Sequence, residues 1–318
     1  FTPSNDSCDF SYHSISELML LFTKERVEEE EVKFNLLLES DSCREKSDQS
    51  WLQLKGTQSS PQIISYMNGV EICSSQEDCW YEDVGFGGQG GLEKMDMSRV
   101  KLMWTNYPNM PTGANATPEL YRKLVDFARR KDIVIVNDNP YSFILNEHPL
   151  SILSVPGAKE CCIEFNSMSK SHNMPGWRIG MLASNADFVQ WILKVKSNID
   201  SGMFRAMQLA AATALEAGEE WYEGNNRNYR GRRRLAGEIM HELGCTYDEN
   251  QVGMFLWGRI PESCDNVEQL TEKILHEARV FITPGFIFGS NGSRYIRISL
   301  CAKKEKIAEA LERIRKVF

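Results

Sequence analysis

The sequence has neither a long hydrophobic run nor a leader-like N-terminus. No stretch of about 18 consecutive apolar residues, the length that a membrane-spanning helix needs, occurs in its 318 residues. The first residues also lack a basic segment followed by an apolar one, which is the pattern of a secretory signal. We therefore predict a cytoplasmic protein without a membrane span.

Cysteines are present, but their spacing does not match a disulfide framework or a zinc site. There are nine, an odd number, and none belongs to a CxxC pair. We therefore expect neither kind of site and no bound metal. Cys161 and Cys162 lie in an apolar, strand-like run, where buried hydrophobic side chains are a better interpretation than a redox pair.

The sequence also lacks the basic stripe of a nucleic-acid-binding protein. Its net charge is −8, and residues 1–91 carry 17 acidic and 6 basic side chains, which gives −11 there and leaves +3 for residues 92–318. One arginine cluster, Arg230 with 232–234, falls within a helical pattern, where a solvated or partner-facing surface is the expected role. We therefore expect no nucleic-acid partner.

Short apolar runs alternate with amphipathic helices from residue 99 onward. Each run is bounded by polar residues, proline or glycine, as buried strands of parallel sheets are. The predicted strands are Val100–Trp104, Ile133–Val136, Cys161–Phe165 and Ile179–Leu182. A helix is predicted to begin after Thr117, because this hydroxyl can cap it and Pro118 suits its first position. The alternation favours an α/β fold with a mostly parallel sheet.

The second half of the sequence predicts a smaller α+β domain. We expect long helices from about residue 203 to 243, strands at 253–257 and 295–300, and a helix near 267–278. A terminal helix follows, with apolar residues on one side: Ile307, Leu311, Ile314 and Phe318. We accordingly predict a large domain over 92–205, and interdomain helices with the small domain over 206–318.

Residues 1–91 differ from the rest of the chain. Residues 16–39 can form a helix, and the acidic segment after them shows no clear period. Residues 85–91 spell GFGGQGG, a literal GxGxxG that can mark a dinucleotide or phosphate cradle. Because no strand precedes it and no good helix start follows, a flexible linker is the better interpretation. We predict an atypical, partly disordered segment.

Five polar motifs follow one another in the remainder. They are PNMPTG at 108–113, DNPY at 138–141, SMSK at 167–170, Arg178 eight residues after Lys170, and RYIRIS at 294–299. Together they supply the groups that hold a phosphorylated pyridine aldehyde and the carboxylate of an amino acid. From about Leu92 to the C-terminus, their order and spacing resemble the class I/II aminotransferases, such as aspartate and LL-diaminopimelate aminotransferases, which use pyridoxal 5′-phosphate (PLP). The resemblance implies a PLP-transferase-like large domain, incomplete here, with a small C-terminal α+β domain.

The resemblance assigns the reacting groups. Lys170 corresponds to the lysine that bonds covalently to the cofactor and then moves the proton at the substrate Cα. Asp138 corresponds to the carboxylate that pairs with the pyridine nitrogen, and Tyr141 to the phenol that donates to the ring oxygen. An Asp-x-x-Tyr pattern alone is typical of a strand-to-loop turn, so the cofactor role depends on the lysine motif downstream.

The resemblance also assigns the binding groups. Ser167, Ser169 and Arg178 correspond to the contacts of the cofactor phosphate. Arg297 corresponds to the arginine that holds the α-carboxylate of the substrate, with Arg294 as an alternative. A surface ion pair is the other interpretation of either arginine.

Two departures from the family pattern bear on activity. The family has NPTG where this chain has MPTG, so the ring oxygen would depend on Tyr141, with Asn109 adjacent to Met110. Residues 1–91, which begin at Phe1, show no substrate-side glycine loop, phosphate loop at a helix start or ring-stacking aromatic of the family. These departures predict weak PLP binding and poor transamination, and they suggest a truncated or frame-shifted gene.

The predicted function is the transfer of an amino group from an α-amino acid to a 2-oxo acid through PLP. The expected partners are these two small molecules and, as in the resembled family, a second copy of the chain in a homodimer. The alternatives are a non-catalytic remnant of an aminotransferase and another PLP reaction, such as β-elimination or decarboxylation, because a fold does not fix the chemistry.

Overall fold

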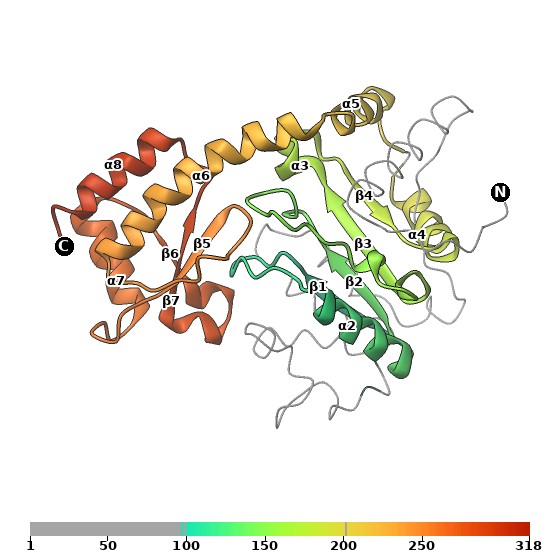
Figure 1. Ribbon diagram of the computed structural model, residues 1–318, viewed down its shortest axis with the longest axis horizontal. Coiled ribbons are helices and arrows are strands. Elements are labelled where there is room, and N and C mark those ends of the chain that lie inside the picture. The colour runs from blue at the N-terminus through green and yellow to red at the C-terminus, as the bar shows by residue number, and fades with distance from the viewer. Residues whose placement is uncertain (1–96, 98–99, 201) are drawn as a thin grey trace. The chain divides into compact units, whose positions relative to one another are not determined.

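The computed structural model describes residues 97, 100–200 and 202–318, and these divide into two compact units (Figure 1). The first, which we call the sheet unit, comprises residues 116–140 and 148–218. The second, the C-terminal unit, comprises the described residues up to 115 together with 141–147 and 219–318. The predicted acidic segment 1–91, with its helix at 16–39 and its linker at 85–91, lies outside the described residues.

The sheet unit combines parallel and antiparallel strand pairing. Its strands β2 (Val134–Asp138), β3 (Cys162–Ser167) and β4 (Gly180–Ala183) are neighbours in that order. Its helices are α2 (Pro118–Lys131), α3 (Met168–Ser171), α4 (Ala186–Ile199) and α5 (Arg205–Leu215), with short 3-10 turns at Ile152–Ser154, Ala158–Glu160 and Pro175–Trp177. β2 and β3 are parallel, with Asp138 level with Phe165, whereas β4 runs antiparallel to β3.

Helix α2 begins where the capping signals predict. The Thr117 side chain accepts the backbone N–H of Leu120 at 3.1 Å, and Pro118 occupies the first turn. The helix buries one apolar face and ends at Asp132, whose φ of 52° is left-handed. Its buried residues are Tyr121, Leu124, Val125, Phe127 and Ala128. This packing sets the start of β2 and brings Asp138 to the end of that strand.

The C-terminal unit is an α+β arrangement around one core. It holds β1 (Leu102–Asn106) and a sheet of order β5-β7-β6, formed by Phe255–Arg259, Tyr295–Ser299 and Thr283–Pro284, in which both pairings are antiparallel. Its helical segments are α6 (Glu219–Glu242), α7 (Val267–Lys273), the π-helical η6 (Ile274–Ala278), the 3-10 segments η7 (Gly285–Phe288) and η8 (Ser290–Arg294), and α8 (Lys304–Ile314). α8 lies beside α6 (Figure 1), and both contribute apolar side chains to the core under the sheet.

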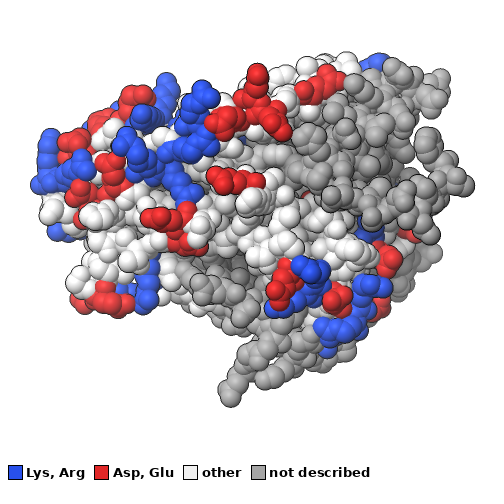
Figure 2. Space-filling model, viewed as in Figure 1, with Lys and Arg blue, Asp and Glu red and all other residues white. Residues whose placement is uncertain are grey.

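The arginine cluster on α6 is divided between surface ion pairs and backbone contacts. Arg230 and Arg234 form ion pairs with glutamates on the same helix, while Arg232 donates to the carbonyl of Leu300 and Arg233 to that of Gln251. Figure 2 shows positive and negative side chains interspersed over this part of the surface. Such mixing gives no continuous positive field over α6.

Two glycines allow close backbone contact beside β7. A Cβ atom added at Gly285 would lie 2.4 Å from the carbonyl oxygen of Gly292 and 2.7 Å from the ring of Trp257. One added at Gly292 would lie 2.0 Å from the carbonyl oxygen of Gly285. Side chains do not fit at such distances from backbone, so both positions require glycine.

The structure confirms the predicted α/β fold with a C-terminal α+β part, although among the described residues the C-terminal unit is the larger of the two. Most predicted strands are shifted by one or two residues, and the predicted terminal helix ends at Ile314, which leaves Phe318 beyond it and 48% exposed. The boundary expected after residue 205 falls at the start of α5, whereas the sheet unit continues to Gly218.

The described residues contain neither a membrane-spanning helix nor a metal-binding cluster. No helix among them is long and apolar enough to cross a membrane. In the same part of the chain, no group of His, Cys, Asp and Glu side chains is arranged to hold a metal ion.

Candidate active site

Two of the predicted site residues end neighbouring parallel strands. Asp138 is the last residue of β2, and Ser167 is the last residue of β3. Because β2 and β3 are parallel, their carboxyl ends meet at the same edge of the sheet. Ligands of α/β sheets characteristically bind at this edge.

The lysine motif forms a short helix directly after β3. The Ser167 hydroxyl accepts the backbone N–H of Ser169 at 3.2 Å and so caps α3. Met168 is 1% exposed and anchors the helix in an apolar cluster with Met174, Ile179 and Ala211. Lys170 is only partly exposed, and its ammonium has no hydrogen bond or ion pair among the described residues. The fold therefore holds the lysine backbone firmly while leaving its amine available.

Arg178 lies at the same end of the β3–β4 pair as the lysine helix. Gly180 begins β4 opposite Ser167, and a Cβ at Gly180 would lie 2.8 Å from the carbonyl oxygen of Asn166. Arg178, two residues earlier, is exposed, has a left-handed φ of 51°, and donates through Nη1 to the carbonyl of Pro175 at 3.1 Å. No other hydrogen bond of its guanidinium occurs among the described residues, which suits an anion-binding role.

Burial changes the acidity of Asp138. Removal from water raises the pKa of this carboxyl group from an ordinary value of 3.8 to about 6. A buried carboxylate of this kind is stabilised by a cation brought beside it, such as a protonated ring nitrogen. The predicted pairing with a ring nitrogen would therefore favour the charged form of Asp138, which burial alone disfavours.

The PNMPTG motif forms a tight turn in the C-terminal unit. The side-chain oxygen of Asn109 accepts both the N–H and the hydroxyl of Thr112, at 3.3 and 2.7 Å. Gly113 follows with a φ of 72°, and its carbonyl accepts the N–H of Val252 at 2.8 Å. Because the amide oxygen accepts both bonds, the Asn109 Nδ2 group remains a donor, and it has no partner among the described residues.

Arg297, on β7, lies between two aromatic rings. Its guanidinium carbon is 4.4 Å from the ring centre of Phe255 and 4.5 Å from that of Phe288. Nη1 donates to the sulfur of Met110 at 3.3 Å, a weak acceptor, and the buried Nε has no partner in the part of the chain that the structure describes. Burial lowers the pKa of Arg297. A carboxylate would supply the missing acceptors.

Tyr141 is buried in the core next to the same aromatic group. Its ring meets that of Phe255 edge to face, with centres 6.0 Å apart. Gly253 lies beside it, where a Cβ would make only an ordinary contact of 3.6 Å with the Tyr141 Cβ, so it is the left-handed φ of 84° that favours glycine there. Within the C-terminal unit, Tyr141 and Arg297 therefore both contact Phe255, and Met110 contacts Arg297.

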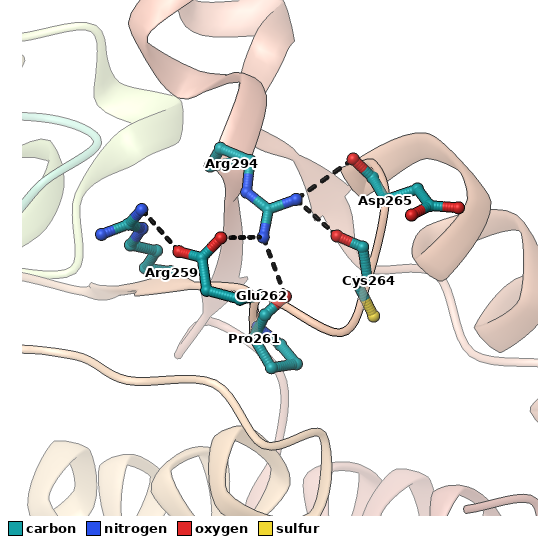
Figure 3. Close-up of polar contacts among 6 residues, drawn as sticks. All are labelled: Arg259, Pro261, Glu262, Cys264, Asp265 and Arg294. Atoms are coloured by element: carbon teal, nitrogen blue, oxygen red, sulfur yellow. Dashed lines mark hydrogen bonds and ion pairs between the residues drawn. The ribbon is translucent and has the colours of Figure 1, made fainter.

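Arg294, the alternative carboxylate ligand, is used by the fold itself. Its guanidinium donates to the carbonyls of Pro261, Cys264 and Asp265 and approaches the carboxylate of Glu262 at 3.5 Å (Figure 3). Glu262 also accepts from Arg259 at 2.7 Å. Arg294 thereby ties the 261–265 loop to β7, and we conclude that it is a structural residue.

The predicted site residues divide between the two units. The sheet unit carries Asp138, Ser167, Ser169, Lys170 and Arg178, and the C-terminal unit carries Asn109, Tyr141 and Arg297. Sequence reasoning missed Phe255 and Phe288 as the aromatic partners of Arg297. The signal was present, because Phe255 and Trp257 alternate in a predicted strand whose residues face those of β7.

Comparison with known proteins matches these features. Residues 89–314 fit the family model "Aminotransferase class I and II". An LL-diaminopimelate aminotransferase of Aquifex aeolicus is 43% identical over 219 residues, which cover 68% of this chain and 56% of that protein. Another, of Maridesulfovibrio salexigens, is 39% identical over 228 residues, which cover 71% of this chain and 58% of that protein. The chain thus spans less than two thirds of the length of these relatives.

Solved structures give the same result. The substrate-bound BacF structure from Bacillus subtilis superposes with a TM-score of 0.67 at 34% identity and covers 74% of this chain and 61% of that one. An aromatic aminotransferase from Pyrococcus horikoshii gives a TM-score of 0.67 at 30% identity, with 76% and 64% covered. This chain therefore belongs to the class I and II aminotransferases, a family whose cofactor is PLP.

Proposed function

We propose that the protein transfers an amino group from an α-amino acid to a 2-oxo acid, with PLP as its cofactor. The observation that carries the proposal is the guanidinium of Arg297. It lies partly buried between Phe255 and Phe288, it retains a buried Nε donor without a partner among the described residues, and it lies beside a thioether. A planar carboxylate is the ligand that this arrangement fits best.

The residues of the sheet unit fit PLP. The amine of Lys170 and the hydroxyl of Ser169 have no partner among the described residues, and the Arg178 guanidinium is exposed. We assign the phosphate to Ser167, Ser169 and Arg178, and the covalent attachment to Lys170. From the C-terminal unit, we assign the ring oxygen to Tyr141 and to the Nδ2 donor of Asn109, because Met110 cannot donate a hydrogen bond.

The proposed mechanism gives each group one task. PLP, when bound, supplies the electron-accepting ring that stabilises negative charge at the substrate Cα. Lys170 removes the proton from this Cα and later returns a proton, as a general base and acid. Asp138 keeps a negative charge beside the ring nitrogen, and Arg297 orients the substrate through its α-carboxylate.

The amino donor that we propose is a diamino dicarboxylic acid of the LL-diaminopimelate type. Support comes from the names of the sequence relatives, including those of Aquifex aeolicus and Maridesulfovibrio salexigens. The structural neighbours have other names, among them aromatic and aspartate aminotransferases, so the donor is best identified by direct competition among amino acids. A homodimer is proposed by analogy with the family.

The test uses the full chain with added PLP. Because of the departures from the family pattern in residues 1–91 and at Met110, we expect weak binding of covalent PLP, seen by its visible absorption, and slow transfer of the amino group of LL-diaminopimelate to 2-oxoglutarate, at a higher kcat/KM than from aspartate or phenylalanine. PLP attachment without transfer would support the non-catalytic alternative predicted from the sequence, whereas release of pyruvate-like or decarboxylated products would favour a different PLP reaction. If PLP does not attach at all, the proposed function is wrong for this chain.

A further inference from the structure

The methionine of the PNMPTG motif contacts the proposed carboxylate-binding arginine. Met110 is partly exposed and packs against the core of the C-terminal unit. Its sulfur lies 3.3 Å from Nη1 of Arg297. A thioether is a weak hydrogen-bond acceptor, so it leaves the guanidinium charge largely uncompensated. A stronger acceptor at the position of the Met110 sulfur would engage the Arg297 guanidinium and weaken its binding of a carboxylate.

We propose that Met110 is an oxidation site through which peroxide weakens carboxylate binding at Arg297. In the reaction, hydrogen peroxide transfers one oxygen atom to the sulfur, two electrons pass from sulfur to peroxide, and water is released. The product, methionine sulfoxide, carries an S=O oxygen on the atom that Arg297 already contacts. The inference rests on the proposed role of Arg297.

The sulfoxide oxygen would act as an internal competitor of the substrate. It is a polar acceptor, and Phe255 and Phe288 confine the guanidinium plane between them, so the arginine cannot turn away from it easily. A hydrogen bond to a charged donor is about twice as strong as one between neutral groups. We therefore expect carboxylate affinity to fall by about tenfold or more, where a factor of ten corresponds to about 1.4 kcal/mol.

The experiment compares four forms of the full chain: parent, Met110→Leu, Met110→Gln and Met203→Leu. Met203, a partly buried methionine of the sheet unit, serves as the matched control. Each is treated with hydrogen peroxide, and peptide mass spectrometry measures sulfoxide at each methionine. Succinate is the carboxylate probe, and calorimetry without PLP gives its Kd before and after treatment. The NMR signal of the Arg297 Nε–H is assigned by its absence in Arg297→Lys. This signal reports directly on the hydrogen bonding of the guanidinium.

We expect peroxide to raise the succinate Kd of the parent and of Met203→Leu about tenfold, and methionine sulfoxide reductase to reverse this. Met110→Leu should show a ratio near one, and Met110→Gln should bind weakly before treatment. An equal loss in Met110→Leu and the parent would overturn the inference. If succinate binding does not depend on Arg297, the proposed carboxylate role of Arg297 fails. The NMR signal then tests the oxidation site separately, because an unchanged Arg297 signal in protein with oxidised Met110 would reject that site as well.

Discussion

In both the sheet unit and the C-terminal unit, one cation that the fold engages can be compared with one that it leaves without a full set of partners. In the sheet unit, Lys196 forms an ion pair with Asp200 at 2.7 Å, whereas the amine of Lys170 has no partner among the described residues. In the C-terminal unit, Arg294 donates to three loop carbonyls, whereas Arg297 keeps a buried donor without a partner there. The contrast teaches that a binding cation is recognised by the donors that the fold leaves unused.

The largest effect is expected at Lys170. We predict that Lys170→Ala abolishes covalent PLP attachment and lowers amino-group transfer by more than about a thousandfold, because one amine both bonds the cofactor and moves the proton. Lys196→Ala is the control, and it should change transfer little, since an exposed ion pair contributes about 0–1 kcal/mol. Borohydride reduction followed by peptide mapping locates the adduct. An adduct on a different lysine would contradict the assignment.

Asp138 should give the next largest effect. We predict that Asp138→Asn lowers the single-turnover rate by about 100-fold or more while changing PLP affinity less, because its charge acts mainly when negative charge develops at Cα. Asp126→Asn, on the exposed side of α2, is the control. PLP affinity and single-turnover rate are measured separately. Equal rates in Asp138→Asn and the parent would show that another group protonates the ring.

Asp138 also predicts a pH dependence of stability in the cofactor-free protein. Its pKa is about 6 when folded and near 3.8 when unfolded, so between these values the folded protein holds a proton that the unfolded chain releases. The unfolding free energy should therefore fall as pH rises from about 4 to 6, by up to about 3 kcal/mol. Asp138→Asn should remove this slope. Denaturant titrations at several pH values measure it, and an identical slope in both proteins would contradict the assignment.

Arg294 tests whether a cation whose donors are engaged by the fold contributes to stability. We predict that Arg294→Ala lowers the unfolding free energy by about 2–4 kcal/mol, because the 261–265 loop loses several charge-assisted hydrogen bonds. Arg259→Ala, which removes only the exposed pair with Glu262, should cost less than about 1 kcal/mol. Chemical denaturation gives both values. Similar losses in the two variants would mean that the loop contacts contribute little.

Arg297 should show the smallest and most selective effect. We predict that Arg297→Lys weakens amino-acid or succinate binding by about 1–3 kcal/mol, because an ammonium cannot reproduce the bidentate contact of a guanidinium. PLP binding and thermal stability should remain close to those of the parent. Calorimetry and melting curves measure both quantities, and loss of PLP binding would instead indicate a structural role for Arg297.

Local signals explain what the sequence predicted well. Thr117 and Pro118 mark the start of α2 through contacts within one helical turn, so no distant information was needed. Strand boundaries were less accurate, since β2 and β3 each end two residues later than their apolar runs, where polar residues such as Asp138 and Ser167 continue the pairing. The terminal helix was extended to Phe318 because its spacing continues the apolar pattern, although the helix stops at Ile314.

The roles of the two arginines depend on long-range structure. Arg294 and Arg297 are three residues apart in one motif, and their sequence neighbourhood does not distinguish them. Arg294 is engaged only because the 261–265 loop, about 30 residues earlier, closes over its side chain. Arg297 is flanked by Phe255 and Phe288 because β5 pairs with β7 and η7 folds back beside it. The assignments of Lys170 and the phosphate ligands remain predictions from the family resemblance.

The contact between Gly285 and Gly292 has a consequence for how this sequence can evolve. A Cβ at either position would overlap the backbone of the other. A second substitution therefore cannot rescue the first, because no side chain is available to shrink in compensation. In a library of all single and paired variants, no replacement at either position should yield a folded protein. Descendants of this gene should therefore keep both glycines together or lose the η7–η8 segment.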